Sequence, residues 1–120
     1  MRILLVDDET EFVSSLSERL DLRGFHSDWV SSGEEALQKA KEKSYDVAVL
    51  DMKMPKVSGI DLKKILQKQC PSMKFIFLTG HGSEEAFRAG SAETGIENYL
   101  LKPVKIEDLV DRIQKIRDES

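Results

Sequence analysis

The chain has little cysteine and no long apolar run, and each absence narrows what it can be. Cys70 is the single cysteine among 120 residues, so no disulfide can form within the chain. This agrees with a reducing compartment, although it does not prove one. No apolar run approaches the roughly 20 residues that a membrane-spanning helix needs, and Met-Arg followed at once by a strand-like run is too short for a signal peptide. We therefore expect a cytoplasmic protein that does not contact a membrane.

An excess of one sign of charge is also missing. The chain has 18 Lys and Arg against 22 Asp and Glu, a formal net charge of −4, and the charges are interspersed. Proteins that bind nucleic acid usually carry a basic patch or stripe, so we expect no direct nucleic-acid binding. The length is enough for one domain with a single core, and no linker, repeat or low-complexity segment interrupts it. We expect one domain over residues 1–120.

What the chain does have is an alternation of short apolar runs with longer amphipathic segments. Three of the short runs are continuously apolar, which is typical of strands covered on both faces. The predicted strands are Arg2–Val6, Phe25–Val30, Asp46–Leu50, Lys74–Leu78 and Asn98–Leu101. Apolar residues at helical spacing follow each strand, in stripes that begin at Phe12, Ala36, Leu62, Ala86 and Ile106. Five strands that alternate with five helices predict an open α/β sheet with helices on both faces.

Charged and polar residues follow these strands, where an open α/β sheet binds its ligands. The residues at the strand ends are Asp7, Asp8 and Glu9, then Asp51, then Thr79, and finally Lys102. If the first and third strands are neighbours, the carboxylates meet, repel one another and raise each other's pKa values. A cation would relieve this repulsion. Oxygen ligands favour Mg²⁺, and no histidine or cysteine pair suggests a softer metal.

A hard divalent ion on an exposed rim usually handles phosphate, which gives each of these residues a chemical role. Asp51 is placed to act as a nucleophile and to become an aspartyl phosphate, with the metal bridging that phosphate and Asp8. Lys102 can pair with a phosphate oxygen as a point charge. The Thr79 hydroxyl can donate a hydrogen bond to another oxygen, and the backbone carbonyl of Lys53 can serve as a neutral metal ligand.

Four sequence motifs then place the chain beside a known family. They are ILLVDDE, VLDMKMPKVSG, FLTGHGS and YLLKP, each at a predicted strand end. Each motif alone is weak, but four in this order are very specific. Over essentially its whole length the chain resembles the receiver domain of two-component response regulators. The resemblance implies a flavodoxin-like (βα)5 fold, a doubly wound parallel sheet with strand order 2-1-3-4-5.

The resemblance also implies roles for individual residues. It makes Asp51 the phospho-acceptor and makes Asp7 and Asp8 the acidic pair that binds Mg²⁺. It implies three further roles: the switch hydroxyl for Thr79, the aromatic switch for Tyr99 and the phosphate-sensing lysine for Lys102. The peptide bond between Lys102 and Pro103 is typically cis in that family.

The function that the resemblance implies is a phosphorelay signalling switch. The chain would take a phosphoryl group from a sensor histidine kinase or a phosphotransfer protein. The face formed by the fourth helix, the fifth strand and the fifth helix would then change, and an output domain or a partner protein would read it. Homodimers that form on phosphorylation are common in that family, which makes a second copy of the chain one candidate partner.

Three other interpretations of the same residues deserve comparison. Asp7 and Asp8 alone would be ordinary helix-capping acids. A small Mg²⁺-dependent phosphatase or phosphotransferase would also use an aspartyl nucleophile. Such enzymes usually place a second acid two residues from the nucleophile on the first strand and carry a cap domain. That spacing is absent from the first strand of this chain. A flavin carrier of similar topology would have a Ser-, Thr- and Gly-rich first loop, whereas this loop is acidic. We therefore expect a switch and not an enzyme that turns over a metabolite.

Overall fold

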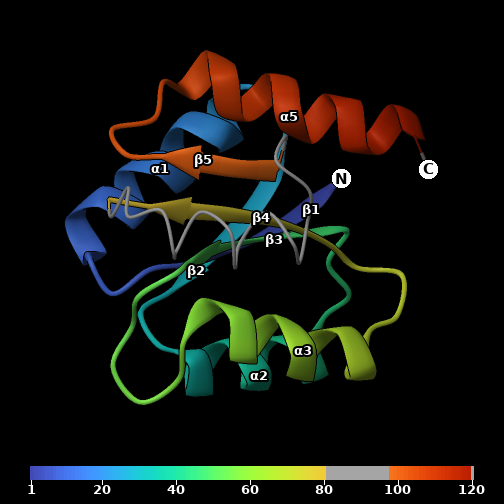
Figure 1. Cartoon of the computed structure of the whole chain (residues 1–120). Coiled ribbons are helices and arrows are strands. Elements are labelled where there is room, and N and C mark those ends of the chain that lie inside the picture. The colour runs from blue at the N-terminus through green and yellow to red at the C-terminus, as the bar shows by residue number, and fades with distance from the viewer. Residues whose placement is uncertain (81–97, 120) are drawn as a thin grey trace.

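The computed structural model describes residues 1–80 and 98–119, apart from the side chain of Thr79. Five parallel strands form one sheet in the order β2-β1-β3-β4-β5 (Figure 1). The strands are β1 (Arg2–Val6), β2 (His26–Val30), β3 (Val47–Asp51), β4 (Lys74–Thr79) and β5 (Tyr99–Leu101). The predicted sheet and its strand order are confirmed.

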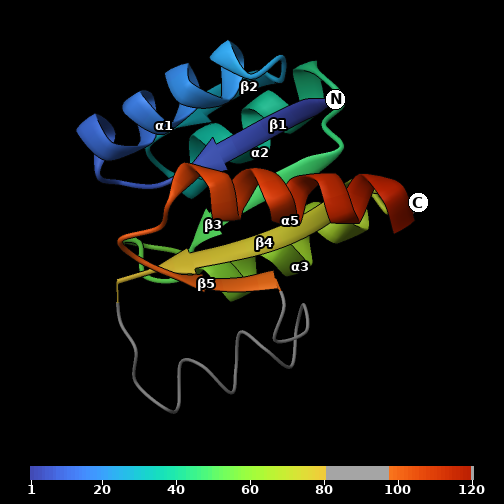
Figure 2. The same cartoon turned by 90° about the horizontal axis from the view of Figure 1, so that it is seen from above.

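Helices cover both faces of this sheet. Those that the structure describes are α1 (Thr10–Leu22), α2 (Gly33–Glu42), α3 (Gly59–Gln69) and α5 (Ile106–Glu119). α1 and α5 lie on one face, and α2 and α3 lie on the other (Figures 1 and 2). The helix predicted to begin at Ala86 lies outside the described residues. No described helix is both long enough and apolar enough to cross a membrane.

The alternation of side chains along β1 explains the two-sided core. Successive residues of a strand point to opposite faces. Ile3 and Leu5 belong to a buried apolar cluster with α1 and α5, whereas Leu4 and Val6 belong to a second cluster with α2 and α3. All four are almost completely buried. Because burying such a side chain contributes about 1.5–3 kcal/mol, both clusters fix the register of the central strands.

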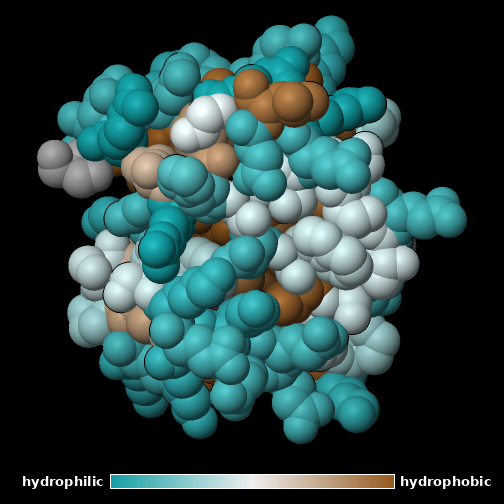
Figure 3. All heavy atoms as spheres, turned by 180° about the vertical axis from the view of Figure 1, so that it is seen from behind, coloured by the Kyte–Doolittle hydropathy of each residue, from teal (hydrophilic) through white to brown (hydrophobic). Residues whose placement is uncertain are grey.

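The surface seen in Figure 3 is mainly hydrophilic, with separate hydrophobic patches.

Five predicted strand boundaries are wrong by one residue. β2 begins after Phe25, and β5 begins after Asn98. β3 begins at Val47 and ends at Asp51, one residue later at both ends than predicted, and β4 extends to Thr79. The two later ends reflect pairing with the neighbouring strand, because Asp51 lies opposite Leu78, and Thr79 lies opposite Leu101. The last residues of the strands, and not only those that follow, therefore form the edge of the sheet.

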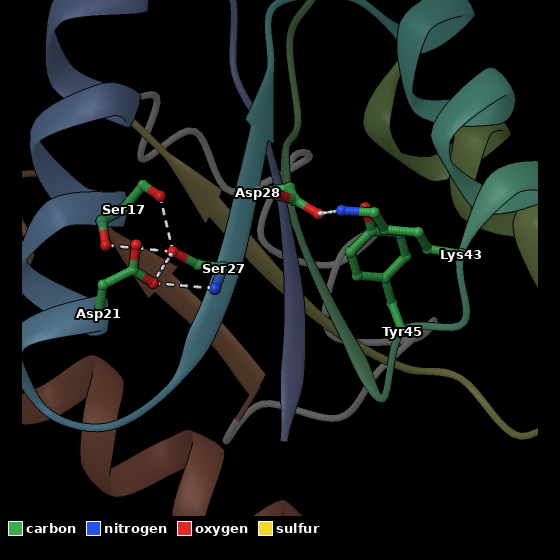
Figure 4. Close-up of polar contacts among 6 residues, drawn as sticks. All are labelled: Ser17, Asp21, Ser27, Asp28, Lys43 and Tyr45. Atoms are coloured by element: carbon green, nitrogen blue, oxygen red, sulfur yellow. Dashed lines mark hydrogen bonds and ion pairs between the residues drawn. The ribbon is translucent and has the colours of Figure 1, made fainter.

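Polar side chains close the outer edge of β2 (Figure 4). The backbone N–H of His26 donates to Met1, so the N–H of the next residue, Ser27, points away from β1. It donates to the Asp21 carboxylate of α1 at 2.9 Å, and the Ser27 hydroxyl donates to the same oxygen at 2.8 Å. The Ser17 and Ser27 hydroxyl oxygens are 2.6 Å apart. An unpaired edge N–H, a common route to aggregation, is thereby satisfied within the chain.

A second polar contact ties the start of β3 to β2. The buried Tyr45 hydroxyl donates to Asp28 Oδ2 at 2.6 Å, and Lys43 Nζ lies 3.3 Å from the same oxygen (Figure 4). The hydrogen bond from Tyr45 is the main cause that lowers the pKa of Asp28. The pKa of Tyr45 is raised, mainly by burial and then by the hydrogen bond to Asp28. Both shifts favour the ionised carboxylate with a neutral phenol.

We predict that Tyr45→Phe lowers the free energy of unfolding at pH 7 by about 1 kcal/mol, because a hydrogen bond to a carboxylate that is partly screened by solvent is lost. The pKa of Asp28 is depressed in the folded state, so this stabilisation is present above the ordinary Asp pKa of about 4 and is lost as the pH falls through the depressed value. Urea unfolding over a pH series measures both effects.

The matched control for this prediction is Lys43→Met. The Lys43 side chain is 44% exposed, so its ion pair with Asp28 is screened and its removal should cost a few tenths of a kcal/mol, about the size of surface pairs. Equal stability of Tyr45→Phe and the wild type at pH 7 would show that the hydrogen bond contributes nothing.

Candidate functional site

Two neighbouring strands bring acidic residues to one edge of the sheet. β1 and β3 pair in parallel with Val6 opposite Leu50, so the next residue of each strand, Asp7 and Asp51, reaches the same level. One carboxylate oxygen from each of Asp7, Asp8 and Asp51 lies within 4.8 Å of the others. Asp7 and Asp51 are buried, whereas Asp8 is exposed. The structure thus brings these three predicted site residues together, with one side open to solvent.

Burial and repulsion act on the central carboxylate of this cluster. The pKa of Asp51 is raised to about 6, first by burial, then by the charge of Asp7, and least by the charge of Asp8. Lys102 and the Lys53 backbone N–H, 3.4 Å from Asp51 Oδ1, act in the opposite direction. A carboxylate whose charged form is disfavoured in this way is stabilised by an added cation. The electrostatics therefore suit a bound metal ion.

The chemistry of the donor set also suits a metal ion. The cluster offers carboxylate oxygens, which hard divalent cations such as Mg²⁺ and Ca²⁺ prefer. Oxygen ligands of one Mg²⁺ lie roughly 3–4 Å apart, given metal–oxygen distances of about 2.1 Å. The three carboxylate oxygens, all within 4.8 Å of one another, are close to that spacing. Lys53 lies two residues after Asp51 and is exposed, and the role of its carbonyl as a metal ligand stays a prediction.

Lys102 reaches the same edge from the end of β5. Its Nζ lies 2.7 Å from Asp7 Oδ2 and 2.8 Å from Glu9 Oε1. The ammonium also lies over the Phe12 ring, 4.7 Å from its centroid. Burial works to lower the pKa of Lys102, but the contacts with Asp7 and Glu9 outweigh it and raise that pKa. The lysine is therefore a firmly protonated cation at the acidic edge, and its peptide bond to Pro103 is cis as predicted.

Two residues of this arrangement have no role in the sequence interpretation. Glu9 contacts Lys102, and this contact lowers the pKa of Glu9. Phe12 supplies the ring below the ammonium. The position of Glu9 directly after two acids at a strand end is a signal for its proximity to the site. Phe12 carries no such signal, because its spacing also fits a helix stripe that faces the core.

The loop after β3 is held close to the site by tight backbone packing. The N–H of Gly59 donates to the Met52 carbonyl at 3.1 Å. A Cβ atom at this glycine would overlap the backbone oxygen of Asp51, so glycine is needed there. Ser58 caps α3 by accepting from the N–H of Asp61. These contacts fix how the chain turns away from Asp51.

The two predicted switch residues lie on neighbouring strands, Thr79 on β4 and Tyr99 on the edge strand β5. Thr79 is the last residue of β4 and pairs with Leu101, and its side chain lies outside the described part of the structure. Tyr99 is the first residue of β5, pairs with Phe77 and is buried. Their backbone positions are therefore offset by two residues along the β4–β5 ladder. The switching roles of both residues stay predictions.

Comparisons with known proteins agree with this architecture. The family model of the response regulator receiver domain matches residues 3–114. The chain is similar to the transcriptional regulatory protein CpxR of Klebsiella pneumoniae, with 43% identity over 119 residues, 99% of this chain and 50% of that protein.

Two solved structures are similar over nearly the whole chain. A response regulator receiver domain protein from Clostridium thermocellum has a TM-score of 0.88 and 35% identity, and the match covers 98% of this chain and 94% of the other. The response regulator protein TrrA from Thermotoga maritima, in complex with Mg²⁺ and BeF, has a TM-score of 0.82 and 31% identity, with 96% and 97% covered. Although the chain spans about half the length of the transcriptional regulators that it matches, sequence and fold lead to one assignment: it belongs to the family of response regulator receiver domains.

Proposed function

We propose that Asp51 accepts a phosphoryl group in a Mg²⁺-dependent reaction and that the chain acts as a phosphorelay signalling switch. A switch controlled by phosphorylation is the general function of the receiver domain family. The observation that carries the proposal is the convergence of Asp7, Asp8 and Asp51, whose carboxylate oxygens lie within 4.8 Å of one another. Two of these acids are buried, which ordinary helix-capping acids have no reason to be.

The phosphoryl donor in this proposal is a phosphohistidine of a sensor histidine kinase or of a phosphotransfer protein. One Asp51 carboxylate oxygen attacks phosphorus and forms the new P–O bond. The P–N bond to the imidazole breaks, and the leaving nitrogen keeps the electron pair. No other covalent partner is needed, so the work of the remaining residues is to orient the groups and to balance their charge.

Asp7, Asp8, Asp51 and the Lys53 carbonyl would hold the Mg²⁺ ion. When bound, a divalent ion neutralises charge on the phosphoryl oxygens and orients them. The Mg²⁺–BeF complex of the Thermotoga maritima relative supports this part of the proposal, since that protein has the same fold. Asp8 is the exposed member of the acidic cluster, so it can coordinate an ion that still keeps some of its water.

Lys102 is the residue that would neutralise the transferred group from the other side. Its ammonium lies against Asp7, next to the acceptor carboxylate, and is protonated. We assign to Thr79 and Tyr99 the hydroxyl and aromatic switch roles that the family resemblance implies. The changed surface would include β5 and α5, since Tyr99 is the first residue of β5 and Lys102 lies between β5 and α5.

The reader of this surface is an output domain or a partner protein. CpxR, about twice the length of this chain, is a transcriptional regulatory protein, which favours an output domain that acts on transcription. A second copy of the chain, bound on phosphorylation, is another candidate. We further propose a cytoplasmic location, where a kinase and an output partner can both reach the domain.

We predict that Asp51→Asn abolishes acid-labile phosphate incorporation from acetyl phosphate with Mg²⁺, because the amide cannot form the acyl phosphate. Radiolabel counted after acid and base treatment measures this loss. Asp61→Asn, the same change at an exposed residue of α3, is the control and should label like the wild type.

The stoichiometry of the same experiment separates a switch from an enzyme. A switch stops at a single phosphate per chain, whereas a phosphatase or phosphotransferase continues through many turnovers on a metabolite. An Asp51→Asn variant that labels as well as the wild type would remove Asp51 as the acceptor.

We predict that Asp8→Ala weakens Mg²⁺ binding about tenfold or more, because a charged oxygen ligand of a hard cation is lost. Calorimetric titration with MgCl₂ measures the dissociation constant. Glu11→Ala removes a nearby exposed acid outside the cluster and should leave the constant unchanged. An unaltered titration of Asp8→Ala would exclude Asp8 as a ligand.

A further inference from the structure

The ammonium of Lys102 is held by groups from a short stretch of the chain. Asp7 and Glu9 supply carboxylate oxygens at 2.7 and 2.8 Å, and Phe12 supplies its ring. Among the residues that the structure describes, Lys102 has no ion pair with Asp51. In the unmodified protein, the ammonium that would bind the phosphoryl group is therefore held by Asp7, Glu9 and Phe12.

Glu9 is committed to this contact rather than to the helix that it precedes. It occupies the N-cap position of α1, yet its side chain makes no capping hydrogen bond there. Its carbonyl accepts from Val13, and its N–H donates to Asp7 Oδ1 at 2.9 Å. The backbone N–H of Glu9 thus contacts the acidic cluster, and its carboxylate forms an ion pair with Lys102.

A phosphoryl group at Asp51 would change the demand on Lys102. The group brings oxygens with a charge of about −1.5 to −2, the value for a phosphate ester. An ammonium has three N–H donors, and the carboxylates of Asp7 and Glu9 occupy it on the side of β1 and α1. The two carboxylates leave at most one donor, so phosphoryl oxygens that use more than one donor compete with the partners that are already there. Of these, Glu9 is the exposed one, with 64% of its side chain open to solvent.

We propose that Glu9 is a positioning residue that holds Lys102 in the unmodified protein and gives it up to the phosphoryl group on Asp51. This inference rests on the proposed function and adds a residue to it. Glu9 lowers the affinity of the site for a phosphoryl group, because part of the attraction of Lys102 is already used. Removing its charge makes Lys102 more available and strengthens phosphoryl binding.

The test measures the affinity for beryllium fluoride, a phosphoryl mimic, at saturating Mg²⁺. Glu9→Gln keeps the size of the side chain and removes its charge. It should bind the mimic about two- to fivefold more tightly, the range expected for an exposed ion pair. Glu11→Gln is the matched control, since it removes one negative charge from the first turn of α1, where Glu11 has no contact with Lys102.

A double-mutant cycle shows whether the effect passes through Lys102. Lys102→Met removes the ammonium, while Asp51 and Mg²⁺ still provide measurable binding. In this background Glu9→Gln should do no more than Glu11→Gln does. Two results would overturn the inference: equal effects of Glu9→Gln and Glu11→Gln in the wild type, or an effect of Glu9→Gln that is the same with and without Lys102.

Beryllium fluoride binding and phosphate labelling of the wild type distinguish a failure of this inference from a failure of the proposed function. A wild type that binds no beryllium fluoride and takes no label at Asp51 overturns both. A wild type that does both, together with an unchanged Glu9→Gln variant, overturns the role of Glu9 alone. Because the Glu9 side chain is exposed, its substitution should leave thermal unfolding unchanged, and this is checked on the same samples.

Discussion

Repulsion among carboxylates at the carboxyl edge of the sheet is the constraint on which the site depends. Two unit charges 4.8 Å apart repel by about 3 kcal/mol at an effective dielectric constant of about 20. This repulsion is present in the folded state because the parallel pairing of β1 and β3 places Asp7 and Asp51 at the same level of the sheet. This repulsion adds to burial in raising the pKa of Asp51, and the ion pair of Asp7 with Lys102 offsets part of it.

Packing in the rest of the fold keeps these carboxylates close together. Both faces of β1 and β3 are covered by apolar clusters, so neither strand can slide to separate the acids. A shift of one residue would turn every side chain of a strand to the wrong face. The close approach of Gly59 to the backbone of Asp51 fixes the loop on the other side. A site built on buried strand ends therefore holds its geometry with little help from loops.

Local patterns in the sequence predict most of this architecture. The apolar run ahead of Asp7 and the one ahead of Asp51 mark buried parallel strands, and their ends meet by the geometry of such sheets. The order of the strands comes from the family resemblance, since apolar runs alone do not say which strands are neighbours. Strand ends were less predictable, because the ladder with β4, and not the apolar run, carries β3 through Asp51.

The contact between Glu9 and Lys102 is of a kind that sequence patterns do not reveal. The two residues are 93 positions apart, and neither their spacing nor a periodic pattern connects them. Their meeting follows only when β5 is placed at one end of the sheet and its exit turns back toward β1. The Phe12 ring illustrates the same point, since its place in a helix stripe predicts burial but not an ammonium above it. The helix that would begin at Ala86 and the Thr79 side chain lie outside the described residues.

The two carboxylates that hold Lys102 differ in strength because they differ in burial. Asp7 is almost inaccessible to solvent, so breaking its pair would leave a buried charge unmatched, a loss that commonly reaches several kcal/mol. The Glu9 carboxylate is largely exposed, and a pair of that kind is worth about 0–1 kcal/mol. A divalent ion at the acidic cluster would take over the charge balance of Asp7. Glu9 would then remain as a weak partner, strong enough to place the ammonium and weak enough to lose it to a doubly charged group.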